Sequence, residues 1–322
     1  MLPLLTFLSK RFPTGAMKEV EWAVNTLARL SEAMVDDANK EIANGGDGGN
    51  HNLLKLFVKA HNRETGDPLG TDEVKAQAFL YLLAGYETTA NTLAYSVYLL
   101  STNPEKEEKL IEEIDRLSGS GQESFQDLKS YVYTEGVVKE ALRLFGPIPL
   151  TDRQASEPMQ VSCVSVFVSP PLSLIFSPLL LSMQLKNFKV DTDQVIHIST
   201  RMMHRNREYF PSPEEFMPER FVKGSEVFDE QEHRAFVPWG LGESCFFLRS
   251  NQSLLRVSNF FILSTGPRMC VAADFALMEA KLALITLYKR FRFEYNKAKK
   301  FEVSFGASLS PVNGIEVFVH PR

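Results

Sequence analysis

Cysteine is scarce in this sequence. Only three cysteines occur among its 322 residues, at Cys163, Cys245 and Cys270. So small and odd a set does not form a disulfide framework, and it fits a reducing compartment. Because no two cysteines have the C-x-x-C spacing, we do not expect a zinc ribbon either.

Basic charge is not in excess. The chain has 35 lysines and arginines against 40 aspartates and glutamates, a formal net charge of -5 at pH 7, with both signs interspersed. Since no basic surface collects phosphates, we expect no nucleic-acid partner. The content of apolar residues, 44%, is typical of a packed globular protein.

The start of the chain has no apolar run long enough to cross a bilayer. Residues 1–12, MLPLLTFLSKRF, have a short apolar stretch with no basic segment before it. We therefore expect neither a membrane anchor nor a signal peptide at this place.

What is present is mostly helical periodicity. Four segments show it: 15–43, 71–101, 104–117 and 126–145. Two later segments are typical of hairpins of short strands: 187–200 and 301–321. We therefore predict a mainly α fold with small peripheral β-sheets (α+β).

The middle of the long second helix carries AGYETTA, residues 84–90. Glycine costs a helix roughly 1 kcal/mol against alanine, and threonines can bond back to carbonyls one turn earlier and bend it. This cost in the middle of a helix indicates a groove there. Beside a cofactor, the groove would bring together the Glu87 carboxylate and the Thr88 hydroxyl, which can hold water and pass protons. The alternative is a helix crossing at which Gly85 allows close packing.

A second motif is EALR, with Glu140 and Arg143 three residues apart on a helix. Arg220, in FMPERF, could join this pair from a distant loop and pin that loop to the core by charge-assisted bonds. The role of such a set would be structural. The alternative is an ordinary pair on an exposed helix face, worth a few tenths of a kcal/mol.

The third motif is GPRMCVAADFALMEAK, residues 266–281, which places Cys270 just before a run of helix formers. Unpaired N–H groups and the positive dipole end of a helix stabilise a thiolate, so the position suits a ligand for a soft metal centre. Arg268 could serve a carboxylate of the same bound group. The alternative for a lone cysteine is a small buried apolar residue.

Taken in order, these motifs resemble those of the cytochrome P-450 superfamily of haem-thiolate monooxygenases. The family's acid-alcohol motif, E-x-x-R motif, P-E-R-F motif and interrupted cysteine loop match, in turn, residues 84–89, Glu140 with Arg143, 218–221, and 236–242 with 267–270. The resemblance implies a cytochrome P-450 fold that binds haem b (iron protoporphyrin IX). Cys270 would be the thiolate ligand of the iron.

The resemblance also implies roles for other residues. Glu87 and Thr88 would form the pair for oxygen activation and proton delivery. Arg153 and Arg268 would bind the haem propionates.

Two further residues, Phe236 and Gly240, would belong to the cofactor-binding loop. Glu140, Arg143 and Arg220 would form the structural triad behind the haem. The substrate pocket would be lined by three parts of the chain: Ala84, 145–150 and 308–313.

The implied reaction inserts one oxygen atom of O2 into a lipophilic small molecule. Its electrons would come from a redox partner, an NADPH-dependent reductase or a ferredoxin. A full-length relative would be membrane-associated, in the endoplasmic reticulum or a plastid. Because the chain begins in what resembles the helices just before the long central one, we expect the family's opening part, with its anchor, to be absent.

The sequence departs from the family pattern at two intrusions, residues 162–186 and 243–266, which we interpret as retained introns within a single partial domain, 1–322. The alternative for 162–186 is a membrane segment, which its three prolines and six serines do not favour. The second splits the cysteine loop, so we expect it to dismantle the support of the thiolate. Ala272 also replaces a glycine usual in the family. The alternatives to an active monooxygenase are a catalytically incompetent fragment that does not bind haem stably and a helical binding module.

Overall fold

The computed structural model describes residues 15–45, 53–62, 65–119, 124–154, 158–163, 166–168, 185–192, 194–229, 235–240, 269–306 and 308–322. Helices dominate it and its small sheets are antiparallel, as predicted from the sequence. The chain divides into two compact units, residues 1–87 and 88–322. The long helix α4 (Thr71–Thr102) runs through the boundary between them.

The first unit consists of α2 (Gly15–Ala43), α3 (Leu53–Val58) and the N-terminal part of α4. Its small core is made of Val35, Ala38, Leu54, Val74 and Ala78. The helices α2 and α4 have the spans predicted from the sequence, whereas the short α3 was not predicted. Residues 53–58 are too few to show a helical period, which explains the omission.

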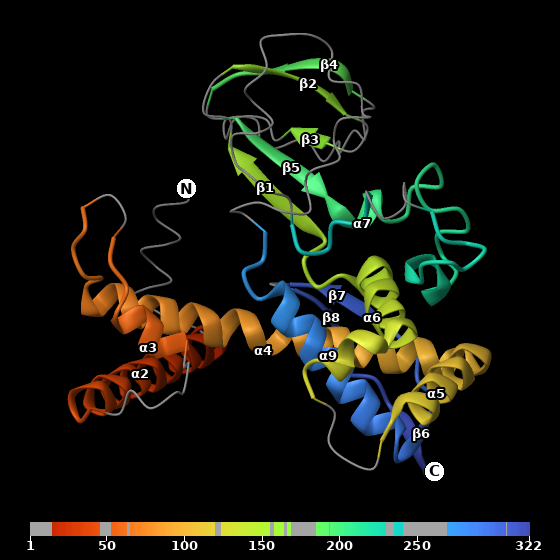
Figure 1. Cartoon of the computed structure of the whole chain (residues 1–322). Helices are drawn as coiled ribbons and strands as arrows, with labels where there is room; N and C mark the ends of the chain where they lie inside the picture. Colours follow the sequence, from red (N-terminus) through yellow and green to blue (C-terminus); the bar gives the residue numbers. More distant parts are fainter. Residues whose placement is uncertain are drawn as a thin grey trace. The chain divides into compact units, whose positions relative to one another are not determined.

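The second unit has a helical core made by the C-terminal part of α4, α5 (Pro104–Leu117), α6 (Val132–Phe145) and α9 (Ala273–Tyr288) (Figure 1). The apolar face of α5, with Leu110, Ile111 and Ile114, is buried in it. This spacing of one and four residues places the three side chains on one face of the helix. A short 3-10 helix, η1 (Asp127–Ser130), leads into α6.

Two carboxylates, the buried Glu113 and the partly exposed Glu135, fix α6 in place. The Glu113 side chain of α5 accepts hydrogen bonds from the amides of Tyr133 and Thr134, each at 2.7 Å, and so caps the N-terminus of α6. From α6, Glu135 binds the buried Lys281 Nζ of α9 at 2.9 Å. The first turn of α6 is therefore bound to both α5 and α9.

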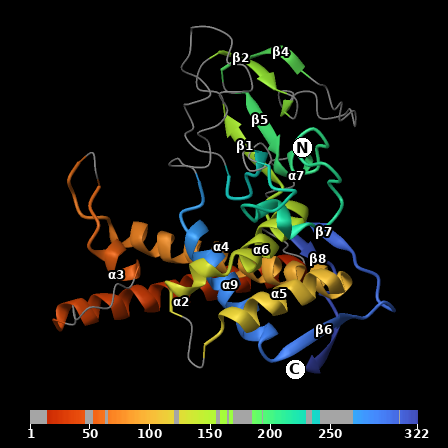
Figure 2. The same cartoon turned by 45° about the vertical axis from the view of Figure 1, so that its right-hand side comes forward.

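Four small sheets occur among the described residues. One has the order β1 (Leu150–Gln154), β5 (Val195–Ser199), β3 (Val166–Val168), and a second pairs β2 (Met159–Cys163) with β4 (Leu185–Val190). Near the C-terminus, β6 (Phe291–Tyr295) pairs with β9 (Val317–Pro321), and β7 (Val303–Phe305) pairs with β8 (Leu309–Pro311). The strands β7 and β8 lie side by side in both views (Figure 2).

The pairing of β4 and β5 corrects one prediction. Both strands form, β5 within 187–200 and β4 starting two residues before it, but they do not form a hairpin with each other. Instead β4 pairs with β2, and β5 lies between β1 and β3. Similarly, 301–321 holds the hairpin β7–β8, while β9 pairs with β6. Alternation of apolar residues indicates that a segment is a strand but does not identify its partner.

After β5 the chain forms α7 (Thr200–Met203) and then η3 (Pro218–Phe221), which holds the PERF sequence. Ser199 is the N-cap of α7, and its side chain accepts from the Met202 amide. The segment between α7 and η3 lies against α6 and meets the residues of the second sequence motif.

Candidate cofactor site

The three residues of the predicted triad lie together and are buried. Glu140, Arg143 and Arg220 are 0%, 1% and 2% exposed. Arg143 Nε and Nη2 donate to the two carboxylate oxygens of Glu140, each at 2.7 Å, and Arg220 Nε lies 3.5 Å from Glu140 Oε1. The alternative of an ordinary pair on an exposed helix face is therefore wrong.

The remaining donors of Arg143 hold the segment that follows α7. Its Nη1 donates to the carbonyl oxygens of His204 at 2.8 Å and Pro213 at 2.7 Å, and its Nη2 to that of Glu215 at 3.1 Å. A planar guanidinium with five fixed donors suits such a set of acceptors. One arginine of α6 thus organises three backbone carbonyls of a segment without regular structure.

Arg220 acts on the same segment from the other end. Its Nη2 donates to the carbonyl oxygens of Pro211 and, at 3.0 Å, Ser212. Glu140 Oε1 also accepts from the Met217 amide at 3.0 Å. The Glu140 carboxylate, buried and bound by several donors, is therefore the common acceptor of α6 and η3.

Gly136 permits the close contact between α6 and η3, and the sequence reading missed it. A Cβ at this position would lie 2.6 Å from the carbonyl oxygen of Pro218, which is closer than van der Waals contact allows. The signal that could have found it is an isolated glycine inside a helical pattern.

His204 is a second residue that the sequence reading missed. It is 2% exposed, and burial, followed by the charge of nearby Arg143, lowers its pKa from 6.5 to about 3. Its Nε2 lies 3.0 Å from the amide nitrogen of Val237 and accepts from it. The imidazole is therefore neutral, with its proton on Nδ1.

The first half of the cysteine loop is a turn packed into the core. The Gly240 amide donates to the Val237 carbonyl at 3.2 Å, with Pro238 at the second turn position and Gly240 at φ 88°. Phe236 packs between His204 and Phe221, with ring centroids at 5.4 Å and 4.6 Å. Whether Phe236 and Gly240 contact a cofactor stays a prediction.

Cys270 joins the second half of the loop to the first. Its amide donates to the carbonyl oxygen of Trp239 at 2.8 Å, and its own carbonyl accepts from the amide of Ala273, the first residue of α9. The two halves therefore meet although residues 243–266 separate them. The expectation that this intrusion takes the loop apart is wrong for this contact.

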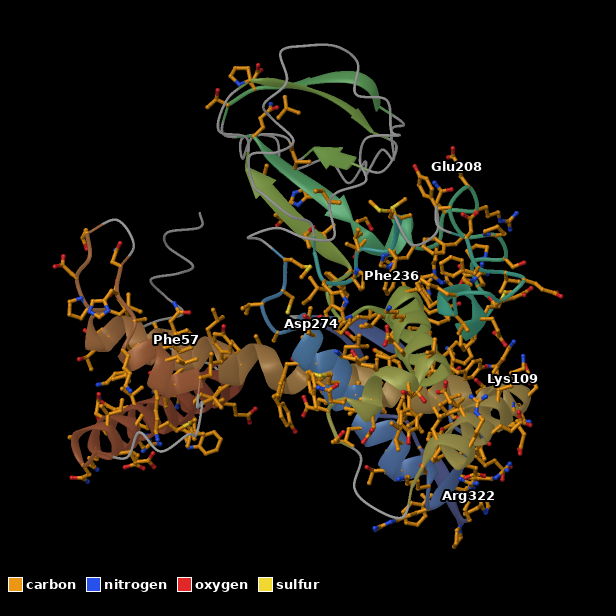
Figure 3. The ribbon with its side chains drawn as sticks, viewed as in Figure 1. Phe57, Lys109, Glu208, Phe236, Asp274 and Arg322 are labelled. Atoms are coloured by element: carbon orange, nitrogen blue, oxygen red, sulfur yellow. The ribbon has the colours of Figure 1, made fainter. Side chains whose placement is uncertain are left out.

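The Cys270 residue itself is exposed, so the alternative of a buried apolar cysteine is wrong. Figure 3 labels Phe236, in the first half of the loop, and Asp274, at the N-terminal end of α9. Asp274 lies in the positive first turn, and Ala272 at the N-cap has no side-chain acceptor for the first amides. The thiol thus stands at an open helix N-terminus, as predicted.

The residues around the thiol fit a flat, apolar group bound through sulfur. Val271 and Phe275, next to Cys270 and one turn away, are 81% and 66% exposed, which is unusual for large apolar side chains. Within the described ranges, no group of three or more His, Cys, Asp or Glu side chains gathers as a multi-ligand metal site would require. A single soft donor on an apolar surface suits haem iron bound by thiolate.

Of the two predicted propionate partners, the described part of the structure includes only the backbone of Arg153. Arg268 lies outside the described residues. Arg153 lies on β1 and pairs with Ile196 of β5, but its side chain lies outside the described part. Their roles stay predictions.

The acid-alcohol motif lies on an unbroken stretch of α4. Glu87 is the last residue of the first unit and Thr88 the first of the second, and the Thr88 carbonyl accepts from Thr92 Oγ1 at 2.8 Å. A Cβ on Gly85 would meet no heavy atom of the described residues within 4 Å, which does not favour the alternative of a close helix crossing. Because Ala84 and Glu87 belong to the other unit, their relation to Cys270 stays a prediction.

Two segments predicted to line the substrate pocket lie together. The Leu309 amide donates to the Pro147 carbonyl at 2.8 Å, which joins 308–313 to 145–150. Asn91 of α4 donates to Ser308 Oγ at 3.1 Å and Ser310 Oγ at 3.0 Å, and so ties 308–313 to the long helix. The sequence reading did not single out Asn91.

No helix among the described residues is long and apolar enough to cross a membrane. This finding concerns α2 and α4 above all, because they are the two longest helices of the described part.

Comparison with known proteins identifies the family. The family model for cytochrome P450 matches residues 1–166, 172–245 and 247–317. Cytochrome P450 4V2 of Homo sapiens is 30% identical over 273 residues, which cover 84% of this chain and 42% of that protein. Thromboxane-A synthase of Sus scrofa is 28% identical over 264 residues, covering 81% and 40%.

A bacterial relative matches a similar share. Cyclooctat-9-en-7-ol 5-monooxygenase of Streptomyces melanosporofaciens is 28% identical over 285 residues, covering 88% of this chain and 50% of that protein. The chain thus spans 40% to 50% of the length of these relatives. Since the family model covers most of its residues, the chain belongs to the cytochrome P450 family.

Proposed function

We propose that this chain supplies the iron-binding part of a haem-thiolate monooxygenase, with Cys270 as the ligand of haem b. The observation that carries the proposal is the exposed thiol at the N-terminus of α9, held by the bond from the Cys270 amide to the Trp239 carbonyl. When bound, the haem supplies the activation of O2 that inserts one oxygen atom into the substrate. The protein supplies ligation, orientation and proton delivery.

The proximal residues have the task of presenting and stabilising the thiolate. The amides in the first turn of α9 point toward the side from which Cys270 enters, where they favour negative charge on sulfur. Phe236 and Gly240 shape the facing loop, and Arg153 and Arg268 would pair with the propionates. The buried triad acts at one remove, because it fixes the backbone behind this loop.

Proton delivery falls to Glu87 and Thr88 on α4. A carboxylate next to a hydroxyl can hold a water molecule and pass its protons into a site that is otherwise dry. A lipophilic substrate would lie against the joined segments 145–150 and 308–313. The family resemblance implies that Ala84 also lines the pocket. Electrons would come from a redox partner, an NADPH-dependent reductase or a ferredoxin, and membrane association is proposed only for a full-length form.

We also propose that 1–322 is one partial domain into which 162–186 and 243–266 are inserted. The continuity of α4 through both units supports a single domain. The strands that flank the first intrusion pair directly, with Met159 opposite Val190 and Val161 opposite Phe188. The described strand β3 lies within that intrusion and pairs with β5, so its removal would leave that sheet with the strands β1 and β5.

The competing proposal is a chain that binds no haem stably. Titration of the full chain with haem, followed by the reduced carbon-monoxide difference spectrum, separates the two. We expect a thiolate-type Soret band from the wild type and from the control variants Cys163→Ser and Cys245→Ser, but not from Cys270→Ser. A wild type without this band, or a Cys270→Ser variant that keeps it, would refute the proposal.

A further inference from the structure

His204 connects the buried triad to the cysteine loop, and none of the roles proposed above uses it. On one side its carbonyl oxygen accepts from Arg143 Nη1 at 2.8 Å. On the other side its Nε2 accepts from the Val237 amide at 3.0 Å. The same residue thus contacts the triad through its backbone and the loop through its side chain.

The loop carries this connection onward to the thiol. Val237 and Gly240 are the ends of the hydrogen-bonded turn, and Trp239 within it accepts from the Cys270 amide at 2.8 Å. A fixed Val237 amide therefore fixes the turn whose carbonyl holds Cys270. Each step in this series is a hydrogen bond. The bond between His204 and Val237 is shielded from water, since these residues are 2% and 5% exposed.

We propose that His204 is a positioning residue for the cysteine loop, setting the place of the Cys270 backbone by accepting the Val237 amide from a site anchored on Arg143. For its meaning in catalysis the inference rests on the proposed function, but the positioning itself concerns only residues of this chain. Phe236 packs against the imidazole with ring centroids at 5.4 Å, which limits rotation of the ring.

The electrostatic surroundings agree with an acceptor role. Burial is the main cause that lowers the pKa of the imidazole, followed by the charge of Arg143 and, last, that of Arg205, while the backbone hydrogen bond with Arg143 acts in the other direction. A neutral imidazole keeps a lone pair on one nitrogen, whereas a protonated one has two donors and could not accept the amide.

Glutamine and asparagine form a matched pair of variants for the test. The amide oxygen of glutamine reaches about as far as Nε2, whereas that of asparagine reaches only as far as Nδ1. Both are neutral and polar, so they differ mainly in whether they can accept from Val237. His204→Gln should therefore retain the position of the loop, and His204→Asn should leave the Val237 amide buried without its acceptor.

Amide hydrogen exchange of the full chain without haem measures the effect. We expect His204→Asn to raise exchange in 235–240 and 269–273 by about tenfold or more, with α5 unchanged, and His204→Gln to stay within about threefold of wild type. Equal exchange of the two variants in these peptides would overturn the inference. Should the asparagine variant not fold, the glutamine variant decides. Exchange at 235–240 as slow as in the wild type supports the proposal, and faster exchange there overturns it.

This result is independent of the proposed function. A wild type that forms no thiolate-bound haem refutes the haem proposal and leaves the exchange pattern unaffected. Conversely, a normal Soret band together with equal exchange of the two variants refutes the role of His204 alone. Reactivity of Cys270 toward iodoacetamide, read by mass spectrometry of its peptide, gives a second measure and should change in the asparagine variant only.

Discussion

The amide of Cys270 donates to the carbonyl oxygen of Trp239 at 2.8 Å, although residues 240–269 lie between them in the chain. In a P450 cysteine loop as the sequence motif defines it, these two positions belong to one short segment. The contact therefore keeps the two ends of the loop together across the intrusion at 243–266. Closing a long loop costs more entropy than closing a short one.

Excision of 243–266, which joins Gly242 to Pro267, should therefore retain the fold and stabilise the loop. We expect a gain of about 1 kcal/mol in the free energy of unfolding, because the closed loop becomes several times shorter. Urea denaturation measures it. A glycine-serine segment of equal length in place of 243–266 is the control and should resemble wild type. Loss of cooperative unfolding after excision would show that the segment belongs to the fold.

Two helix glycines should respond in opposite directions to alanine. At Gly136 a Cβ would lie 2.6 Å from the Pro218 carbonyl oxygen, so Gly136→Ala must push η3 away from α6. We expect a loss of about 1–3 kcal/mol, as for other overpacked sites. At Gly85 a Cβ meets nothing within 4 Å among the described residues, so Gly85→Ala should gain about 0.5–1 kcal/mol from helix propensity.

Thermal or urea unfolding of these two variants is a direct test of the contact between α6 and η3. Two losses of similar size would show that Gly85 has a packing role, and two gains would show that the contact with Pro218 is looser than the structure has it. Haem binding should fall for Gly136→Ala, because the displaced η3 carries Arg220.

Removal of Arg143 should be among the most destabilising changes in the second unit. Arg143→Leu leaves the Glu140 carboxylate buried without its bidentate partner, and it frees three backbone carbonyls. We expect a loss of about 3–5 kcal/mol, as is usual when one member of a buried pair is removed. Arg143→Lys keeps the charge but not the fork of donors. Its free energy of unfolding should therefore lie between those of Arg143→Leu and the wild type, measurably apart from both.

The control is an ion pair on the surface. Lys300 and Glu302 form one at 2.5 Å with most of the Lys300 side chain in solvent. Lys300→Met should have no measurable effect on the midpoint of urea unfolding. If Arg143→Leu and Lys300→Met had similar effects, the triad could not be what holds the segment between α7 and η3.

The part of the fold that the sequence predicts is the part decided by local patterns. The helix predicted over 71–101 is α4, and the one predicted over 126–145 is α6, although α6 starts only at Val132, after the separate 3-10 helix η1. Both follow from apolar spacing and end signals, and Cys270 before α9 follows from the run of helix formers after it. The pairing of Glu140 with Arg143 follows because three residues on one helix are neighbours.

What the sequence does not show is which distant groups meet. Three contacts join residues whose own neighbours in the sequence give no hint of the partner. They are His204 with Val237, Gly136 with Pro218, and Thr134 with Glu113, which caps it. Each such contact depends on the packing of two elements that must first form. For the same reason, β4 and β5 were recognised as strands but assigned the wrong partners.

Acid should weaken the second unit through His204. Burial, and next the charge of Arg143, lower the pKa of this histidine from 6.5 to about 3. Because the unfolded chain binds the proton more tightly than the folded one, the contribution of His204 is complete above about pH 6.5. It is lost as the pH falls from there toward about 3, by roughly 1.4 kcal/mol per pH unit.

A comparison with His204→Gln isolates this effect. Glutamine does not titrate, while the other groups that weaken the fold in acid are the same in both proteins. One of them is Glu135, whose hydrogen bonds to Lys139 and Lys281 lower its pKa against the opposing effect of burial. Urea unfolding at pH 7.5, 6, 5 and 4.5 should therefore show that the free energy of unfolding falls more steeply with decreasing pH in the wild type than in His204→Gln. Parallel curves would mean that the folded protein accommodates a charged His204, and the hydrogen bond from Val237 could then not be what holds the loop.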